Sequence, residues 1–154
     1  MAPRTLLFAT DYTAASDFAL EYAAALARDL GARLIIVHVS EHELLPVGES
    51  VDQVPAPCRE ELSRLQAVKP RGSDLHYEHE LLFAEPTCQN VDPAREIIRF
   101  ADRTGVEAIV VGAHGRTGLS RVLCGSVAEE LVRHAHCPVV TVRCPRGGSP
   151  DETA

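Results

Sequence analysis

The sequence predicts an α/β protein with one open, mostly parallel five-stranded sheet and helices on both faces. Apolar runs alternate with segments whose apolar residues recur at helical spacing, which is typical of repeated strand-helix units. The run Leu34–Val39 is nearly all apolar, as expected for a strand covered on both faces in a parallel sheet. Connections between parallel strands are right-handed crossovers, so successive helices can cover both faces.

The first third of the chain predicts a strand-helix-strand unit. Arg4–Ala9 forms its first strand and Leu34–Val39 its second. Gly31 supplies a helix C-terminal stop between them. The helix before Gly31 is indicated by apolar residues at helical spacing, namely Ala15, Phe18, Ala19, Tyr22, Leu26 and Leu30.

The middle of the chain is less regular. Ser40–Pro57 is rich in Glu, Pro, Gly and Ser and predicts a long surface loop, a candidate lid over a site. Cys58–Val68 predicts a short helix, and Leu75–Phe83 predicts a third strand near a sheet edge. Ala84–Val91 is expected to be a loop.

The last third predicts two further helices and two further strands. Asp92 is a candidate N-cap with Pro93 in the first turn, and Gly105 is the candidate stop of that helix. The helix between them carries a buried stripe of Ala94, Ile97, Ile98 and Ala101. The remaining elements are a strand at Val106–Val111, a helix at Ser126–Ala135 and a strand at Val139–Val142.

Length and composition predict one soluble domain. A chain of 154 residues can bury enough surface for a core, so we expect one domain at 1–145 and a flexible tail at 146–154. With 45% hydrophobic and 24% charged residues, the composition is that of a globular protein. No apolar run approaches the roughly 20 residues that cross a bilayer, and no signal peptide is recognisable. We therefore expect a cytoplasmic protein without a membrane partner.

Charge argues against nucleic acid as a partner. The formal net charge is −7, whereas nucleic-acid phosphates need clustered Lys and Arg. A small anionic ligand is still possible, because Arg116 and Arg121 can make a local positive pocket on an acidic body.

The cysteines predict neither a disulfide framework nor a zinc knuckle. The chain has five cysteines, an odd number, and no CxxC pair, so we interpret them as reduced thiols. His134–Cys137 contains potential metal ligands, but residues so close together at a helix end rarely converge on one ion.

The spacing G-x2-G-x9-G-S, formed by Gly112, Gly115, Gly125 and Ser126, predicts a phosphate-binding segment. Glycines permit positive φ and a close approach of ligand, and the start of a helix offers free N–H groups to an anion. The segment is neither a GxGxxG fingerprint nor a Walker A loop. Alternatively, Ser126 is a helix cap that forms a capping box with Glu129, and the glycines are ordinary turn residues.

The expected topology brings this segment close to the first strand. Ligands of open α/β sheets bind beyond the carboxyl ends of the strands, where the strand order reverses. If the first and fourth strands are neighbours, Ala9–Asp11 and Gly112–Ser126 meet at that edge.

Five segments resemble the universal stress protein family. These are Leu6–Thr13, Val37–Val39, Gly112–Leu119, Leu123–Ala128 and His136–Val140. The resemblance covers nearly the whole chain. It implies a Rossmann-like five-stranded fold, similar to adenine nucleotide alpha hydrolases, with strand order 3-2-1-4-5. For members with the full glycine pattern it also implies ATP binding.

The resemblance also implies which residues bind the nucleotide. The adenosine end would be lined by Ala9, Thr10, Asp11 and Val39. Ribose and phosphates would be held by Val111, Gly112, Gly115, Gly125, Ser126 and Val127.

Three polar side chains have alternative roles. Asp11 either accepts hydrogen bonds from the nucleotide or helps to hold phosphate-bound Mg²⁺, or it caps a local turn. His114 is in reach of a phosphate but is first a structural residue of the loop. Arg116 either pairs with phosphates or is solvated.

The predicted function is that of a cytoplasmic stress-response switch that binds ATP, or AMP or ADP, with at most slow ATP hydrolysis. We expect a homodimer through the edge strand Val139–Val142 and nucleotide-dependent contacts with a client protein. The alternative is a nucleotide-independent interaction module of the same fold. An enzyme of the adenine-nucleotide hydrolase type is disfavoured, because its Gly-rich first turn with a catalytic serine is absent.

Overall fold

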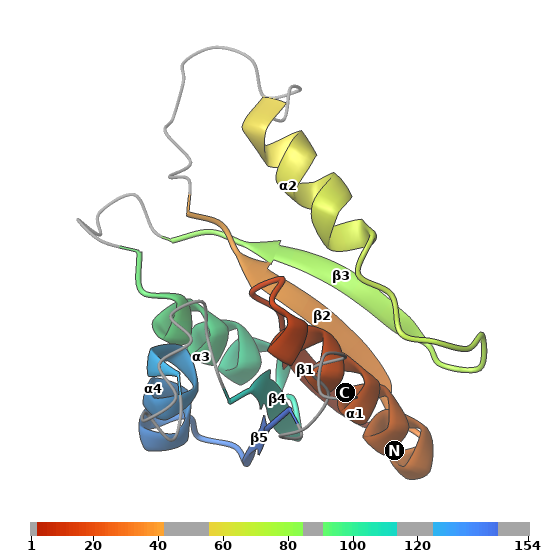
Figure 1. Cartoon of the computed structure of the whole chain (residues 1–154). Helices are drawn as coiled ribbons and strands as arrows, with labels where there is room; N and C mark the ends of the chain where they lie inside the picture. The colour runs from red at the N-terminus through yellow and green to blue at the C-terminus, as the bar shows by residue number, and fades with distance from the viewer. Residues whose placement is uncertain (1–2, 42–55, 85–90, 114–124, 145–154) are drawn as a thin grey trace, which may run out of the picture.

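A computed structural model of the chain describes residues 3–41, 56–84, 91–113 and 125–144. They form one parallel sheet of order β3-β2-β1-β4-β5, which confirms the predicted fold and strand order (Figure 1). The elements are β1 (Thr5–Ala9), α1 (Ala14–Leu30), β2 (Arg33–Val39), α2 (Ala56–Gln66), β3 (Tyr77–Leu82), α3 (Pro93–Thr104), β4 (Ala108–Gly112), α4 (Ser126–His134) and β5 (Val139–Val142).

Most helix ends follow the predicted caps. Gly31 and Gly105 close α1 and α3 in the left-handed conformation, with φ of 61° and 68°. Asp92 accepts a hydrogen bond from the backbone N–H of Arg95, as expected for an N-cap. The third strand is shorter than predicted, and α2 begins at Ala56, two residues before the expected start.

Two helices cover each face of the sheet (Figure 1). Because side chains alternate along a strand, Leu34 and Ile36 of β2 face α1 and α2, whereas Ile35 and Val37 face α3 and α4. Both faces are therefore buried, as the apolar strand sequences predicted. No helix in the described part of the chain is long and apolar enough to cross a membrane.

The buried stripe of α1 consists mostly of small residues, and this brings the helix close to the sheet. A Cβ added to Gly112 at the end of β4 would lie 3.1 Å from the carbonyl carbon and oxygen of Ala15. The first turn of α1 therefore packs directly on the carboxyl end of β4. The fully buried members of the stripe are Ala19, Ala23, Ala24 and Ala27.

All five strands end at the same edge of the sheet because they are parallel. The ladder continues one residue beyond three of them, with Thr10 N–H donating to Val37, Ser40 N–H to Leu82 and Ala113 N–H to Val142. Most of the candidate lid and the predicted tail 146–154 lie outside the described residues. The site is therefore built from the strand ends and the helix starts that surround them.

Candidate functional site

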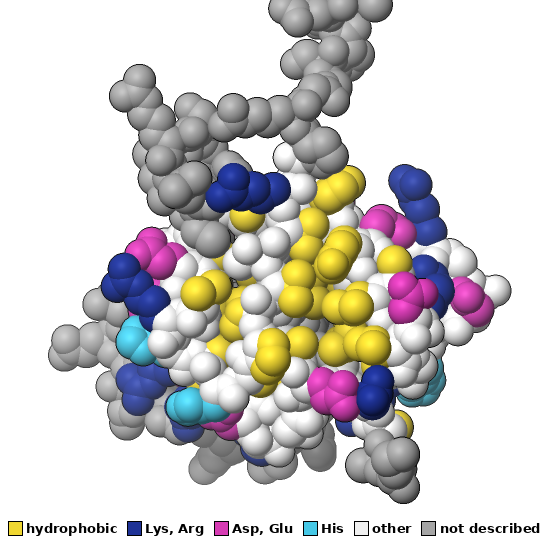
Figure 2. Space-filling view, turned by 90° about the horizontal axis from the view of Figure 1, so that it is seen from below, with side chains coloured by type: hydrophobic (Ala, Val, Ile, Leu, Met, Phe, Trp, Pro, Cys, Tyr) yellow, Lys and Arg dark blue, Asp and Glu magenta, His cyan; other side chains and the backbone are white. Residues whose placement is uncertain are grey.

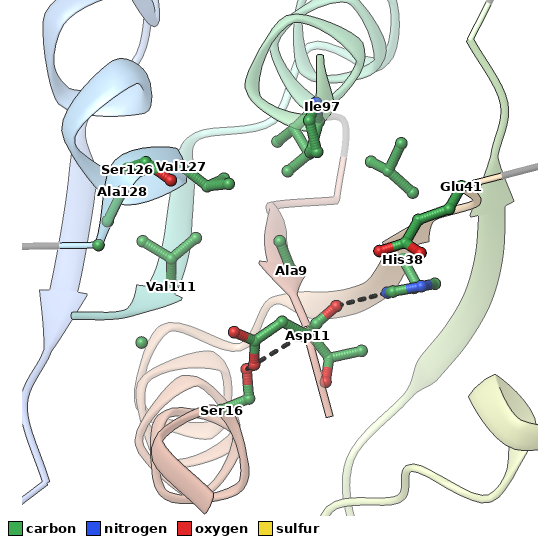
Figure 3. A pocket seen from close by; sticks show the side chains of 15 residues that line it. Ala9, Asp11, Ser16, His38, Glu41, Ile97, Val111, Ser126, Val127 and Ala128 are labelled. Atoms are coloured by element: carbon green, nitrogen blue, oxygen red, sulfur yellow. Dashed lines mark hydrogen bonds between the residues drawn. The ribbon is translucent and has the colours of Figure 1, made fainter. Parts of the chain in front are cut away.

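A pocket of about 280 Å³ opens at the carboxyl edge of the sheet (Figure 3). It lies where β1, β2 and β4 end and where α3 and α4 begin. Its lining residues are Ala9, Thr10, Asp11, Ser16, His38, Val39, Glu41, Pro93, Ile97, Val111, Gly112, Gly125, Ser126, Val127 and Ala128.

Every predicted site residue that the structure describes lines this one pocket. The segments after β1 and β4 meet there, as the neighbouring positions of the two strands predicted. The backbone N–H of Gly125 donates to the carbonyl of Ala113 at 2.5 Å, which fixes the start of α4 against the end of β4. The remaining predicted residues, His114, Gly115 and Arg116, lie outside the described residues.

Asp11 organises the turn between β1 and α1. Its Oδ1 accepts hydrogen bonds from Thr13 N at 3.0 Å, Thr13 Oγ1 at 2.5 Å and Ser16 Oγ at 2.7 Å. Thr13 Oγ1 in turn accepts from Ser16 N and caps α1. The local-turn role of Asp11 is therefore confirmed. Its Oδ2 makes no hydrogen bond within the described part of the chain, so one oxygen is still available to a ligand.

The alternative interpretation of the start of α4, a capping box formed by Ser126 and Glu129, is wrong. Gly125 is the N-cap residue, and no side chain of the described residues caps this helix. Ser126 already has helical geometry as the first residue of α4, where its hydroxyl cannot serve the N-cap position. Glu129 instead accepts a hydrogen bond from Arg133 at 2.7 Å. Among the residues that the structure describes, no side chain caps the first-turn N–H groups of α4, which lie beside the pocket.

The two motif glycines that the structure describes do not use the positive φ that glycine permits. Gly125 has φ −64°, and Gly112 is not among the residues with positive φ. Gly112 is required for a different reason, because a side chain there would meet the backbone of α1. The glycine thus serves helix-sheet packing at the pocket floor.

His38 lines the opposite end of the pocket and has a defined tautomer. Its Nδ1 lies 2.7 Å from the carbonyl oxygen of Thr10. A carbonyl only accepts, so Nδ1 donates and Nε2 of the neutral ring is an acceptor. The His38 ring packs on Tyr12, with ring centroids 4.4 Å apart.

Tyr12 links the pocket to α2. It adopts φ 64°, an uncommon conformation for a non-glycine residue, and the guanidinium of Arg64 lies 4.1 Å from its ring centroid. Burial raises the pKa of Tyr12 to about 12, with Arg64 opposing the shift and the carboxylate of Glu61 adding to it. The Tyr12 hydroxyl is buried and has no hydrogen-bond partner among the described residues.

The family model of the universal stress protein family matches residues 3–143. The chain belongs to the universal stress protein family. This confirms the resemblance carried by the sequence motifs and accounts for the strand order, since solved members share the fold.

Three relatives show how far the similarity extends. The universal stress protein YxiE of Bacillus subtilis is 30% identical over 149 residues, which cover 90% of this chain and 97% of YxiE. Universal stress protein MJ0531 of Methanocaldococcus jannaschii is 50% identical over 54 residues, so that match spans about a third of each protein, 35% and 32%. The universal stress protein of Archaeoglobus fulgidus in complex with dAMP is 27% identical, with a TM-score of 0.61 and coverage of 92% and 98%.

Sequence reasoning missed several pocket residues in this universal stress protein. His38 could have been identified from the sequence, because it is the one polar residue within the apolar run Leu34–Val39. Ile97 was predicted to be buried, but its side chain also faces the pocket (Figure 3). The missed residues are Ser16, His38, Glu41, Pro93, Ile97 and Ala128.

The histidines near the C-terminus pair with separate carboxylates. His136 Nδ1 lies 2.9 Å from Asp102 Oδ2, and His134 Nε2 lies 3.3 Å from Glu130 Oε2. Burial raises the pKa of the Cys137 thiol, and the nearby Asp102 adds to the shift. Within the described ranges, no group of three or more side chains could hold a metal ion.

Proposed function

We propose that this chain binds an adenine nucleotide, ATP or its products ADP and AMP, in the pocket at the carboxyl edge of the sheet. The observation that carries the proposal is the first turn of α4, which no side chain of the described residues caps and whose residues Ser126–Ala128 line the pocket. Free N–H groups and the helix dipole favour an anion there. The dAMP complex of the Archaeoglobus fulgidus relative supports the choice of an adenine nucleotide.

The pocket has a polar end and an apolar wall that suit the parts of a nucleotide. Phosphates would lie along Gly125–Val127, with Ser126 Oγ as a further donor. Val39 and Ile97 form an apolar wall against which a nucleoside packs. The free oxygen of Asp11 is suited to accept from a ribose hydroxyl.

Mg²⁺ would enter as a companion of the phosphates. Mg²⁺ keeps most of its waters and is usually held by one or two carboxylates together with substrate phosphates. Asp11 offers one such carboxylate oxygen in the pocket. ATP with Mg²⁺ is therefore the form that we expect Asp11 to favour over AMP.

We infer a nucleotide-dependent switch in the stress response of the cytoplasm, with at most slow hydrolysis of ATP. Fast hydrolysis needs a group that orients water and a cation that stabilises developing charge. Asp11 Oδ1 is already bonded to Thr13 and Ser16. The only lysine of the chain, Lys69, precedes β3. It therefore lies toward the amino ends of the strands, whereas the pocket lies at their carboxyl ends. Nucleotide-dependent contacts with a client protein would be the output.

A homodimer through β5 is part of the proposal. β5 is an edge strand, and an edge offers unpaired N–H and C=O groups to a second copy across a two-fold axis. Figure 2 shows hydrophobic side chains gathered across the middle of the face seen from below. Exposed large hydrophobic side chains occur on α1 and α4, the helices that contact β5, at Phe18, Tyr22 and Val132.

The test is the nucleotide content and affinity of the purified protein. Mass spectrometry of small molecules released on denaturation should detect AMP, ADP or ATP, and calorimetry of the stripped protein should give saturable ATP binding. A Gly115→Val, Gly125→Val double variant should lose this affinity while its unfolding transition stays cooperative. An empty pocket without titratable affinity would instead support the nucleotide-independent interaction module.

A further inference from the structure

Tyr12 has a backbone conformation that the contacts around it must hold. Among the described residues it is the only non-glycine residue with a positive φ, which is 64°. For a bulky residue this conformation is unfavourable and persists only where the surrounding structure fixes it. Tyr12 separates Asp11, which lines the pocket (Figure 3), from Thr13. Its φ therefore sets how Thr13 N and Oγ1 reach Asp11 Oδ1, to which they donate at 3.0 and 2.5 Å.

Three neighbours hold Tyr12 in this conformation. Its N–H donates to Thr10 Oγ1 at 3.0 Å, and its ring packs on His38 with centroids 4.4 Å apart. The guanidinium of Arg64 lies 4.1 Å from the ring centroid, within the range of a cation-π contact. Arg64 belongs to α2, an element none of whose described residues lines the pocket. The turn beside the pocket is therefore held in part by a helix outside it.

A second contact joins α2 to the pocket wall. Ser40 is fully buried, and its Oγ donates to Glu61 Oε2 at 2.5 Å. Ser40 lies between Val39 and Glu41, which both line the pocket. Glu61 and Arg64 are three positions apart and share one face of α2. This one helix face therefore contacts the segments that follow β1 and β2, and both segments line the pocket.

We propose that Arg64 is a positioning residue of the pocket, through which nucleotide affinity and the order of α2 depend on each other. This inference rests on the proposed nucleotide binding. Arg64 keeps Tyr12 in its left-handed conformation, and that conformation keeps Asp11 bonded to Thr13 at the pocket. Coupling between two sites is reciprocal, so a nucleotide that fixes this turn also stabilises α2. The order of α2 is then an output of the proposed switch.

Arg64→Ala tests the effect of α2 on the pocket. Calorimetry with ATP on the stripped full chain should show about three- to fivefold weaker binding, as expected for loss of an exposed cation-π contact. Arg64→Lys keeps a cation over the ring and should bind less than about twofold more weakly than the wild type. Arg103→Ala is the matched control, because Arg103 lies 5.5 Å from the Phe100 ring centroid and neither residue lines the pocket. It should bind ATP as the wild type does, and unchanged affinity in Arg64→Ala would overturn the proposal.

Tyr12→Gly shows whether Arg64 acts through Tyr12. Glycine adopts positive φ without strain, so this variant permits the same turn but has no ring for Arg64 to contact. In the Tyr12→Gly background, Arg64→Ala should change ATP affinity by less than about 1.5-fold. The same loss in both backgrounds would overturn the proposal, because Arg64 would then act by another route. A wild-type chain that binds no ATP would overturn the proposed function itself.

Hydrogen exchange of the wild-type chain covers the case in which Arg64→Ala fails to fold. Saturating ATP should slow amide exchange at least about threefold in α2 and also in the first turn of α4, which lines the pocket. In Tyr12→Gly the slowing should remain in α4 and be lost from α2. Exchange in α2 that does not respond to bound ATP in the wild type, or that slows equally in both proteins, would overturn the proposal.

Discussion

Gly112 lies so close to Ala15 that a Cβ would come within 3.1 Å of the Ala15 carbonyl carbon and oxygen. In an unobstructed strand, Gly→Ala stabilises a protein by reducing the entropy of the unfolded chain. We expect Gly112→Ala to have the opposite effect and to lower the free energy of unfolding by about 1–3 kcal/mol. Urea denaturation measures this, and a variant more stable than the wild type would contradict the close packing.

Ser126→Ala should separate ligand binding from helix capping. Replacing an N-cap serine by alanine costs about 1 kcal/mol of stability. Ser126, however, is the first residue of α4 and not its N-cap residue. We expect the free energy of unfolding to change by less than about 0.5 kcal/mol. ATP affinity should fall about five- to tenfold, through loss of a hydroxyl donor to phosphate. A stability loss without an affinity loss would restore the capping interpretation.

Tyr12→Phe should not destabilise the protein near neutral pH. The Tyr12 hydroxyl is buried and has no partner among the described residues, which is unfavourable. The phenyl ring can keep its contacts with His38 and Arg64. Thermal unfolding should show equal or higher stability, by up to about 1 kcal/mol. A loss of stability of more than about 1 kcal/mol would reveal a hydrogen bond to the hydroxyl.

The pKa of Tyr12 predicts a distinct alkaline titration. Burial favours the neutral phenol and raises its pKa from 10.0 to about 12. The pKa of Tyr12 is higher in the folded protein than in the unfolded chain. The stability that the neutral, buried phenol permits is therefore fully present below pH 10 and is lost as the pH rises to about 12. Tyrosinate absorbance of the folded protein should contain a late component that is missing in Tyr12→Phe. Over this range Tyr12→Phe should become progressively more stable than the wild type.

Thr141→Pro should block dimer formation while preserving the sheet. The carbonyl of Pro138 accepts from Ile109 in β4, and that of Val142 accepts from Ala113 just after β4. Alternation along the parallel strand therefore directs the N–H of Thr141 to the open edge. Proline removes that donor. Light scattering should give a dimer for the wild type and for the control Thr141→Ala, and a monomer for Thr141→Pro. A dimeric proline variant would place the interface elsewhere.

Features set by local chemistry were predictable from the sequence. The left-handed stops at Gly31 and Gly105 and the cap at Asp92 depend on a few adjacent residues, and all three were identified correctly. The burial of β2 on both faces followed from the apolar run Leu34–Val39.

Features set by contacts between distant segments were not predictable in this way. Gly112 is glycine because of Ala15, which lies in another element, so its residue type alone could not distinguish packing from a turn. Tyr12 has a left-handed backbone in a turn without glycine, and Arg64 from α2 covers its ring. Ser126 has the residue type of a cap, but Gly125 is the N-cap residue.

The buried alanines of α1 limit which amino-acid substitutions this protein can accept during evolution. Ala19, Ala23, Ala24 and Ala27 have no exposed surface, so any larger side chain there would lift the helix from the sheet and displace the turn at its start. The face of the sheet beneath α3 and α4 packs with branched and aromatic residues such as Ile97 and Phe100. A smaller side chain at one of these positions can be compensated by a larger one at a neighbouring position. Mutational drift that preserves the pocket should therefore accumulate beneath α3 and α4 and spare the layer beneath α1.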